Sequence, residues 1–355
     1  MDEIVRRLAA VNGAAGCYFA SMREGSWVPG YLAGRGFGFA AWQSWDVGYA
    51  PAGWTALTDH LRDLGVADQA ILAAGLAKPS ARGTLIDVFR DRLTFGVRSL
   101  DGALAGFIGR SCAEGPVYLN TPATRLYRKG SLLFGLHEAL PALAAGARPV
   151  IAEGPLDAIA ITVAGRADPA RHARYAGVAP CGTALTAAQV RLLRDAVRGS
   201  ARISRGQAGL LVAFDADPPG RRAAVRAYHL LRARAAAVSL PDGSDPAGYL
   251  RDHGAAALAG LLDSAPPLAD LVIDERVAAF DRWLEFPDGA FAALHAAAPL
   301  IAGLPPDQVA RQVGRLAARL NLPHPDVTEA VTTALTHLVT TLPDHPEPVP
   351  PPGAA

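Results

Sequence analysis

Two acidic clusters lie far apart in the sequence, and each directly follows a short apolar run. The first run precedes Glu153 and Asp157, and the second, residues 210–214, precedes Asp215 and Asp217. Each run is short enough to be a strand covered on both faces, and a helical pattern follows, which is typical of parallel strands linked by crossover helices. Because open α/β sheets place their sites at the carboxyl ends of neighbouring strands, we expect these carboxylates to lie together.

The chemistry of such a cluster indicates a divalent cation. Carboxylates that face one another destabilise a fold unless a cation neutralises them, so Mg²⁺ or Mn²⁺ is expected here, and with it phosphoryl-transfer chemistry. Each half alone is weak evidence, because E-x-x-x-D is often a solvated helix start and D-x-D occurs in several unrelated kinds of site. An EF-hand loop is excluded by Pro218, Pro219 and Gly220, which stand where further ligands would be needed.

Length and composition predict a globular protein of more than one compact unit. The chain has 355 residues, of which 50% are hydrophobic, enough for sizeable cores. No run of about 18 uncharged apolar residues could span a membrane, and Asp2 and Glu3 do not fit a signal peptide, so a cytoplasmic protein without membrane partners is expected. Cys17, Cys112 and Cys181 lack the spacing of a zinc site or a disulfide framework, so no zinc is expected.

The distribution of charge says more than the net charge of +1. Residues 82–129 contain eight basic residues against four acidic ones, and such a local basic face can bind phosphates even in a nearly neutral chain. The alternative is an ordinary solvated surface of mixed charge. The chain has two lysines, Lys78 and Lys129, among 34 basic residues. A lysine kept among so many arginines suggests a site that needs a compact point charge.

Other patterns predict the elements around the sheet. Residues 2–24 and 52–77 have helical spacing, whereas 93–97 and 104–108 are predicted to be strands joined by a turn. Residues 177–181 are predicted to form a second parallel strand.

At the end of that strand, Gly182 and Thr183 are expected to leave backbone N–H groups free for phosphate, and Thr186 to cap a helix running through Arg194. From about residue 252 the sequence is rich in Ala and Leu with helical periodicity. The final segment is rich in proline and is expected to be disordered.

A resemblance to a known family rests on blocks of residues that occur in a fixed order. In the second half these are Glu153-Gly154-Pro155-Leu156-Asp157, Gly182-Thr183-Ala184-Leu185-Thr186, Phe214-Asp215-Ala216-Asp217 with Gly220, and residues 240–246. Upstream they are residues 31–36, 48–51, 89–95, 106–110, 118–124 and 129–136. The first set resembles the Toprim domain of bacterial DnaG-type primases, and the second resembles the amino-terminal half of the same catalytic core. The resemblance covers roughly residues 1–260.

The resemblance implies a fold of the α/β and α+β classes, with a parallel-sheet Toprim domain between two other parts. We expect a mixed α+β subdomain over residues 1–146, the Toprim domain over 147–251, a helical subdomain over 252–342 and a disordered tail over 343–355. Primases of this family usually add a zinc-binding domain and a helicase-binding domain, and this chain is expected to lack both. It is expected to act as a monomer.

The implied activity is the joining of ribonucleoside triphosphates into short primers on a single-stranded DNA template. Glu153, Asp215 and Asp217 are then expected to be catalytic, with Asp215 and Asp217 as principal Mg²⁺ ligands. Asp157 and Asp245 are expected as further ligands or as residues supporting them. Glu153 is either a ligand or the acceptor of the hydroxyl proton, and the sequence leaves both roles open.

The resemblance also implies where nucleic acid and nucleotide bind. Arg92, Arg110 and Lys129 are expected to contact template or triphosphate, and Asn120 to orient one of them. Gly182 and Thr183 are expected beside the nucleotide. For Arg92 the competing interpretation is a buried ion pair with Asp87 or Asp91.

One departure from the family pattern is Val117, which stands where a lysine is usual. Losing that basic side chain is expected to weaken the binding of template or nucleotide, and a separate helicase or zinc-binding protein is a possible partner. Two other functions stay open: a nucleic-acid-binding protein that keeps the fold without the activity, and a Toprim nuclease.

Overall fold

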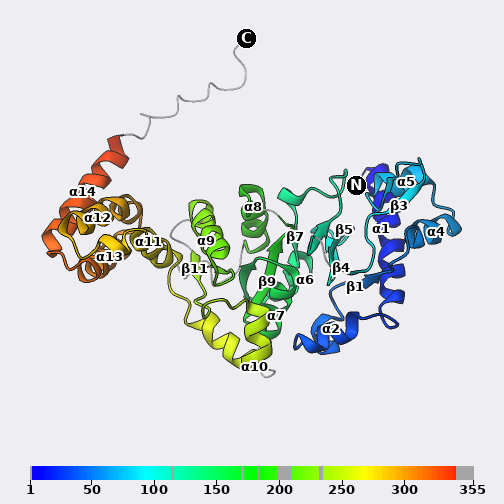
Figure 1. The fold of residues 1–355 in the computed structure, drawn as a ribbon, viewed down its shortest axis with the longest axis horizontal. Coiled ribbons are helices and arrows are strands. Elements are labelled where there is room, and N and C mark those ends of the chain that lie inside the picture. Colours follow the sequence, from blue (N-terminus) through cyan, green and yellow to red (C-terminus); the bar gives the residue numbers. More distant parts are fainter. Residues whose placement is uncertain are drawn as a thin grey trace, which may run out of the picture. The chain divides into compact units, whose positions relative to one another are not determined.

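The computed structural model describes residues 2–112, 116–168, 172–182, 184–198, 209–231 and 235–340. The chain divides into two compact units, Met1–Pro267 and Leu268–Ala355. Figure 1 follows the chain through both units. None of the helices in the described ranges is long and apolar enough to cross a bilayer. The predicted tail, 343–355, lies outside the described residues.

The amino-terminal part of the first unit is built on a four-stranded antiparallel sheet in the order β1-β4-β5-β6. Aromatic side chains hold helix α1 against this sheet, with the rings of Phe19 and Phe107 in edge contact at 5.2 Å. Its elements are α1 (Glu3–Met22), α2 (Val28–Gly34), α3 (Phe39–Trp42), β1 (Val47–Ala50), α4 (Ala56–Asp63), α5 (Asp68–Ala73), β2 (Ala77–Pro79), β3 (Leu85–Asp87), β4 (Arg92–Arg98), β5 (Leu104–Arg110) and β6 (Tyr118–Asn120).

The second part of this unit is a five-stranded sheet in the order β11-β10-β8-β9-β7, flanked by helices. Strands β8 to β11 pair in parallel, as the sequence predicts, and β7 adds an antiparallel edge to β9. The elements are η1 (Lys129–Ser131), β7 (Leu133–Phe134), α6 (Leu136–Ala144), β8 (Arg148–Ala152), α7 (Pro155–Gly165), β9 (Tyr175–Pro180), α8 (Ala187–Ala196), β10 (Leu210–Ala213), α9 (Pro218–Leu231), β11 (Ala235–Ala237) and α10 (Pro246–Asp263).

One hydrophobic core joins the two sheets. Trp45 stacks on Phe134 at 5.3 Å between ring centroids, and Phe95 contacts the same ring edge-on at 5.8 Å. The core continues through the buried strands β8 and β10. Because burial this extensive fixes the strands that carry the acidic residues, the loops at their carboxyl ends begin from a rigid base.

The predicted elements agree closely with the observed ones, with one exception. The predictions for α1, β4, β5 and β9 are confirmed, and Thr186 caps α8 in a reciprocal capping box with Gln189. The stretch 52–77 is not one helical run, because Gly65 adopts a φ of +77° and separates α4 from α5.

The second unit is helical. It contains α11 (Leu268–Ala278), η4 (Asp281–Trp283), α12 (Pro287–Ala302), α13 (Pro306–Leu320) and α14 (His324–Thr340). Asn321, with a φ of +51°, ends α13, and α14 begins at His324. Helix α10 crosses the expected boundary at residue 251, and the first compact unit extends to Pro267.

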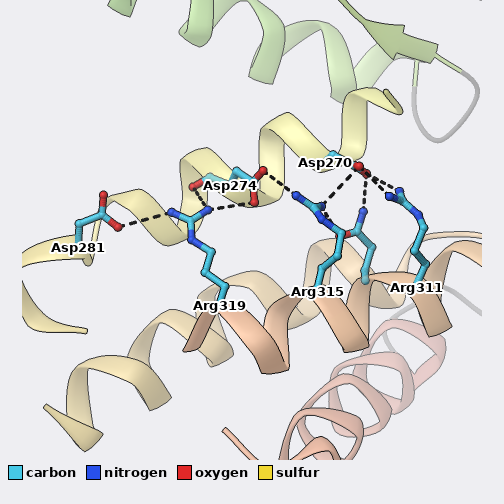
Figure 2. Close-up of polar contacts among 7 residues, drawn as sticks. Asp270, Asp274, Asp281, Arg311, Arg315 and Arg319 are labelled. Carbon is cyan, nitrogen blue, oxygen red and sulfur yellow. Dashed lines mark hydrogen bonds and ion pairs between the residues drawn. The ribbon is translucent and has the colours of Figure 1, made fainter. Parts of the chain in front are cut away.

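An aspartate–arginine ladder links α11 to α13 in the second unit (Figure 2). It consists of Asp270, Asp274 and Asp281 on one side and Arg311, Arg315 and Arg319 on the other. Arg311 donates to the buried Asp270 at 2.7 Å, Arg315 lies between Asp270 and Asp274, and Arg319 bridges Asp274 and Asp281. The arginines are spaced four residues apart, so they share one face of α13.

Candidate metal and phosphate site

The acidic residues stand at the carboxyl edge of the parallel sheet, as predicted from their strands. Glu153 follows β8, and Asp157 lies in the first turn of α7. Asp215 follows β10. Asp245, from a third segment, is the N-cap of α10, where its side chain accepts a hydrogen bond from the backbone N–H of Gly248. Three segments that are far apart in the sequence therefore bring carboxylates to the same edge of the sheet.

Glycine at position 220 allows α9 to start against this edge. A Cβ there would lie 2.0 Å from the carbonyl oxygen of Asp215 and 2.9 Å from Oε1 of Glu153. Pro218 and Pro219 occupy the first turn of α9, where a missing N–H costs nothing. A side chain at position 220 would therefore push α9 away from the acidic residues.

These carboxylates line one cavity of about 270 Å³, which we call the carboxylate cavity. Its acidic side contains Glu153, Asp157, Asp215 and Asp245, and its basic side contains Arg35 and Arg110. Tyr118, Asn120 and Gly182 complete the polar part of the wall. Four carboxyl groups and two guanidinium groups thus share a space large enough for a small polar ligand.

Burial and mutual repulsion raise the pKa values of three carboxyl groups, those of Asp215, Asp157 and Glu153. The pKa of Asp215 rises to about 8, first through desolvation and then through the nearby charges of Asp157, Glu153, Asp245 and Asp217. The pKa of Asp157 rises to about 7 for the same reasons, with Asp245 as the main charged neighbour. Burial also raises the pKa of Glu153. For Asp157 and Asp215, desolvation and the neighbouring acids therefore outweigh the stabilisation of the ionised form by hydrogen bonds and positive charges.

Two observations bear on whether a cation fits. The Oδ1 atom of Asp215 is buried without a hydrogen-bond partner, which is unusual for a polar atom unless a ligand completes it. Within the described ranges no group of three or more His, Cys, Asp or Glu forms a ready-made metal cage. Mg²⁺ does not need one, since it keeps several waters and binds through one or two carboxylates. The residues present fit such an ion.

The basic side is organised by two tyrosines. Arg110 donates from Nε to the hydroxyl of Tyr31 at 2.6 Å and from Nη1 to that of Tyr118 at 2.9 Å. The guanidinium carbon of Arg35 also lies over the Tyr31 ring, 5.4 Å from its centroid. Desolvation raises the pKa of Tyr118 to about 12, so its hydroxyl stays protonated and can both accept from Arg110 and donate.

Sequence reasoning missed Arg35, Tyr31 and Tyr118 as site residues. The block 31–36 was identified for its resemblance alone, and nothing in its spacing relates it to acids that lie more than a hundred positions later. The only available signal was that Arg35 and Tyr118 both lie inside such blocks.

Of the predicted site residues that the structure describes, three do not line the carboxylate cavity. The carboxylate of Asp217 accepts the backbone N–H of Gly220 at 2.7 Å and so caps the start of α9, next to the cavity. Lys129 begins η1, and its carbonyl accepts from Gln189 at 2.9 Å. Arg92 lies at the start of β4, where it donates to the carbonyl of Pro116 at 3.0 Å.

The ion-pair interpretation of Arg92 is wrong. Asp87 is buried and accepts from the backbone N–H groups of Leu57 and Thr58, and Asp91 accepts from Trp27 and Tyr49. Both carboxylates are therefore used elsewhere, as caps and anchors within the amino-terminal part.

Two further details of the predicted phosphate loop differ from expectation. The N–H of Gly182 donates to the carbonyl of Pro180 at 3.0 Å, so it is not free for a phosphate. Asn120 accepts from the hydroxyl of Tyr127 at 2.7 Å, and it forms no hydrogen bond with Arg92, Arg110 or Lys129, one of which it was expected to orient. Thr183 lies outside the described residues.

Comparison with known proteins agrees with this geometry. Residues 19–140 match the model of the DNA primase catalytic core, N-terminal domain, and residues 150–250 match a Toprim-like model. The crystal structure of the RNA polymerase domain of Mycobacterium tuberculosis primase DnaG is 31% identical, with a TM-score of 0.75, and the alignment covers 88% of this chain and 98% of that one. This chain belongs to the DnaG primase family.

Two other relatives extend the comparison. The same mycobacterial domain in complex with a double-stranded DNA oligomer with a 6-nucleotide overhang is 32% identical, with a TM-score of 0.74 over 90% of this chain and 98% of that one. The DNA primase of Streptomyces coelicolor is 36% identical over 278 residues, which are 77% of this chain and 41% of the relative. This DnaG-family chain therefore spans less than half the length of that curated relative.

Proposed function

We propose that this chain is a primase core that joins ribonucleoside triphosphates into a primer on single-stranded DNA. The observation that carries the proposal is the carboxylate cavity, whose wall contains four acids together with Arg35 and Arg110. Phosphoryl transfer needs both features, because metal-binding oxygens must lie beside donors for the triphosphate. A protein that only bound nucleic acid would have no use for four acids gathered without an ion-pair partner.

On the acidic side, Asp215 is the proposed principal ligand of a divalent cation, with Asp157, Asp245 and Glu153 around it. Bound there, Mg²⁺ would neutralise phosphate charge and lower the pKa of the attacking primer hydroxyl. Glu153 accepts the backbone N–H of Asp215 at 3.2 Å, which holds its carboxylate at the edge of the site. It serves either as a ligand or as the acceptor of the hydroxyl proton. Asp217 supports the site by fixing the start of α9.

On the basic side, Arg110 and Arg35 are proposed to bind the triphosphate. A guanidinium group has five N–H donors, and Arg110 uses Nε and Nη1 on the two tyrosines. Its remaining donors are available for phosphate oxygens, while the tyrosines fix the plane of the group. Lys129 lies outside the cavity, so we assign it to the template or to a more distant part of the nucleotide.

A surface on the amino-terminal part is proposed to hold the template. Trp54 is 63% exposed, and the guanidinium carbon of Arg90 lies 4.4 Å from its ring centroid. An exposed aromatic ring beside a cation is a platform on which an unpaired base can stack. Arg90 and the half-buried Arg92 belong to the basic stretch 82–129. We accordingly propose that residues 1–146 bind template and that 147–251 carry the chemistry, whereas the helical subdomain begins at Leu268.

The test is template-directed synthesis. The chain is incubated with single-stranded DNA, labelled ribonucleoside triphosphates and Mg²⁺ or Mn²⁺, with and without an annealed primer. We expect labelled products that depend on template and metal and that are lost on chelation. Arg110→Gln should reduce synthesis and raise the apparent KM for nucleotide, whereas Lys78→Gln on the β2–β3 hairpin should change neither. A chain that extends no annealed primer under these conditions would contradict the proposal.

A further inference from the structure

Helices α8 and α9 present a row of arginines that the carboxylate cavity does not use. We define the α8–α9 arginine face as Arg191 and Arg194 on α8 with Arg222 and Arg226 on α9. All four side chains are exposed. Arg222 and Arg226 are four residues apart, and Arg191 and Arg194 are three apart, so each pair lies on one side of its helix.

The two helices lie side by side against the parallel sheet (Figure 1). Both begin at the carboxyl ends of parallel strands, and Nη2 of Arg194 donates to the carbonyl of Leu230 at 3.4 Å, near the end of α9. The two pairs of arginines therefore form one surface. It starts at the edge that carries Asp215 and extends away along the outer faces of the helices.

The charge on this surface is one-sided. Helices α8 and α9 contain five arginines and a single acid, Asp195, although the whole chain has a net charge of only +1. Arg191 and Arg222 make no hydrogen bond or ion pair with any described residue. Some exposed arginines elsewhere do have an acidic partner, as Arg62 has in Asp68 at 2.8 Å. Uncompensated like charges of this kind favour an anionic partner.

The surface is also connected to the active edge. Helix α9, which carries Arg222 and Arg226, starts directly against this edge, since a Cβ on Gly220 would lie 2.0 Å from the carbonyl oxygen of Asp215. A polyanion that follows the arginine face therefore arrives at the carboxylates of the site. This continuity distinguishes the face from a basic patch placed anywhere else on the surface.

We propose that the α8–α9 arginine face binds the phosphate backbone of the duplex formed by template and growing primer; this proposal rests on the proposed function. Among the described residues of α8 and α9, no Phe, Trp or Tyr is exposed. Single strands are usually held by aromatic stacking together with charge, as Trp54 and Arg90 would do, whereas duplex is held through its phosphates. The two surfaces thus suit different forms of the same nucleic acid.

The test compares two pairs of substitutions with the same change of charge. Arg191→Gln/Arg222→Gln removes two charges from the face, and Arg276→Gln/Arg282→Gln removes two exposed charges from the second compact unit. The probes are a labelled primer–template duplex and a single strand of the same length, measured by fluorescence anisotropy between about 50 and 200 mM salt.

We expect the first pair to weaken duplex binding and to make the slope of log Kobs against log salt shallower by about 2, the value for two lost phosphate contacts. Single-strand binding should change less, and the control pair should keep the wild-type slope. Arg191→Lys/Arg222→Lys should restore the slope if charge is the cause, which also shows that the loss is not one of folding.

The proposal is overturned if duplex affinity and slope are unchanged, which would leave an acidic protein as the partner of this face. The proposal is also overturned if the control pair of substitutions lowers duplex affinity as much as the first pair does, or if the first pair lowers affinity for the single strand alone. Binding does not require synthesis, so its outcome is independent of primer extension. A wild-type chain that binds duplex through this face but makes no product would contradict the proposed function alone.

Discussion

The carboxylate cavity and the aspartate–arginine ladder use the same side chain in opposite ways. In the cavity, Asp157 and Asp215 face other acids, and their pKa values rise to about 7 and about 8. In the ladder, Asp270 is also buried, yet it accepts from Arg311 and Gln312 and lies 3.5 Å from Arg315 (Figure 2).

The difference teaches how to separate a structural acid from a functional one. A buried carboxylate that is fully paired stabilises the particular packing of two helices, and nothing further is required of it. A buried carboxylate that faces like charges reduces stability, and such groups persist where a ligand or a reaction needs them. Burial alone does not distinguish the two regions. The sign of the neighbouring charges does.

The largest expected effect comes from removing one charge in the cavity. Asp215→Asn should lower primer extension by more than about 100-fold, because even outer partners of metal ligands are worth 10- to 100-fold. Asp274→Asn, a matched change in the ladder, should leave the rate of extension unchanged. Both rates are measured on an annealed primer at saturating Mg²⁺. Similar rates for wild type and Asp215→Asn would remove the distinction between the two regions.

The second effect is on stability and has the opposite pattern. Asp270→Asn should lower the free energy of unfolding of the second unit by about 2 kcal/mol, because two arginines lose a charged acceptor in a partly buried place. Asp215→Asn should leave the stability of the metal-free protein unchanged or raise it, since it relieves repulsion. Denaturant unfolding monitored by circular dichroism measures both. A destabilised Asp215→Asn protein would show that this carboxylate supports the fold.

The third effect concerns pH in the absence of metal. The folded-state pKa values of Asp157 and Asp215 lie above the ordinary value of 3.8, so the folded protein binds more protons than the unfolded chain between about pH 4 and pH 8. The stabilisation from these groups is complete below about pH 4 and is lost as the pH rises to about 8. With a chelator present, the melting temperature of wild type should therefore fall relative to that of Asp215→Asn over this range. Adding Mg²⁺ at about pH 8 should raise the melting temperature of wild type above that of Asp215→Asn. If the melting temperatures of the two proteins change in parallel with pH, this prediction is wrong.

The smallest effect is expected at the exposed end of the ladder. Asp281 is 61% exposed in its side chain and lies 3.5 Å from Arg319. Asp281→Asn should therefore cost no more than about 0.5 kcal/mol, and the cost should disappear in high salt because exposed pairs are screened. Unfolding at low and high ionic strength, with Asp270→Asn beside it, gives the comparison. If Asp281→Asn lowered the free energy of unfolding as much as Asp270→Asn does, burial would not determine how much each ion pair contributes.

The sequence by itself determined the parallel strands, the order of the motifs and the edge at which the acids meet. These properties are local, because hydrophobic period, strand length and capping residues act over a few positions. Glu153, Asp157 and Asp215 therefore came together as predicted, and Thr186 capped its helix. The family resemblance extended the prediction to Asp245 and to Arg110.

Only the tertiary structure decided which side chains face one another. Arg35 and Tyr118 come from segments far from the acids, and it is the packing of the core that brings them to the cavity wall. In the same packed structure Asp217 caps the start of α9, and Lys129 lies outside the cavity. Asp87 accepts hydrogen bonds from the backbone of α4 and does not pair with Arg92. Which donor binds a carboxylate depends on which one the folded chain places within hydrogen-bond distance. The spacing of residues along the sequence does not determine that.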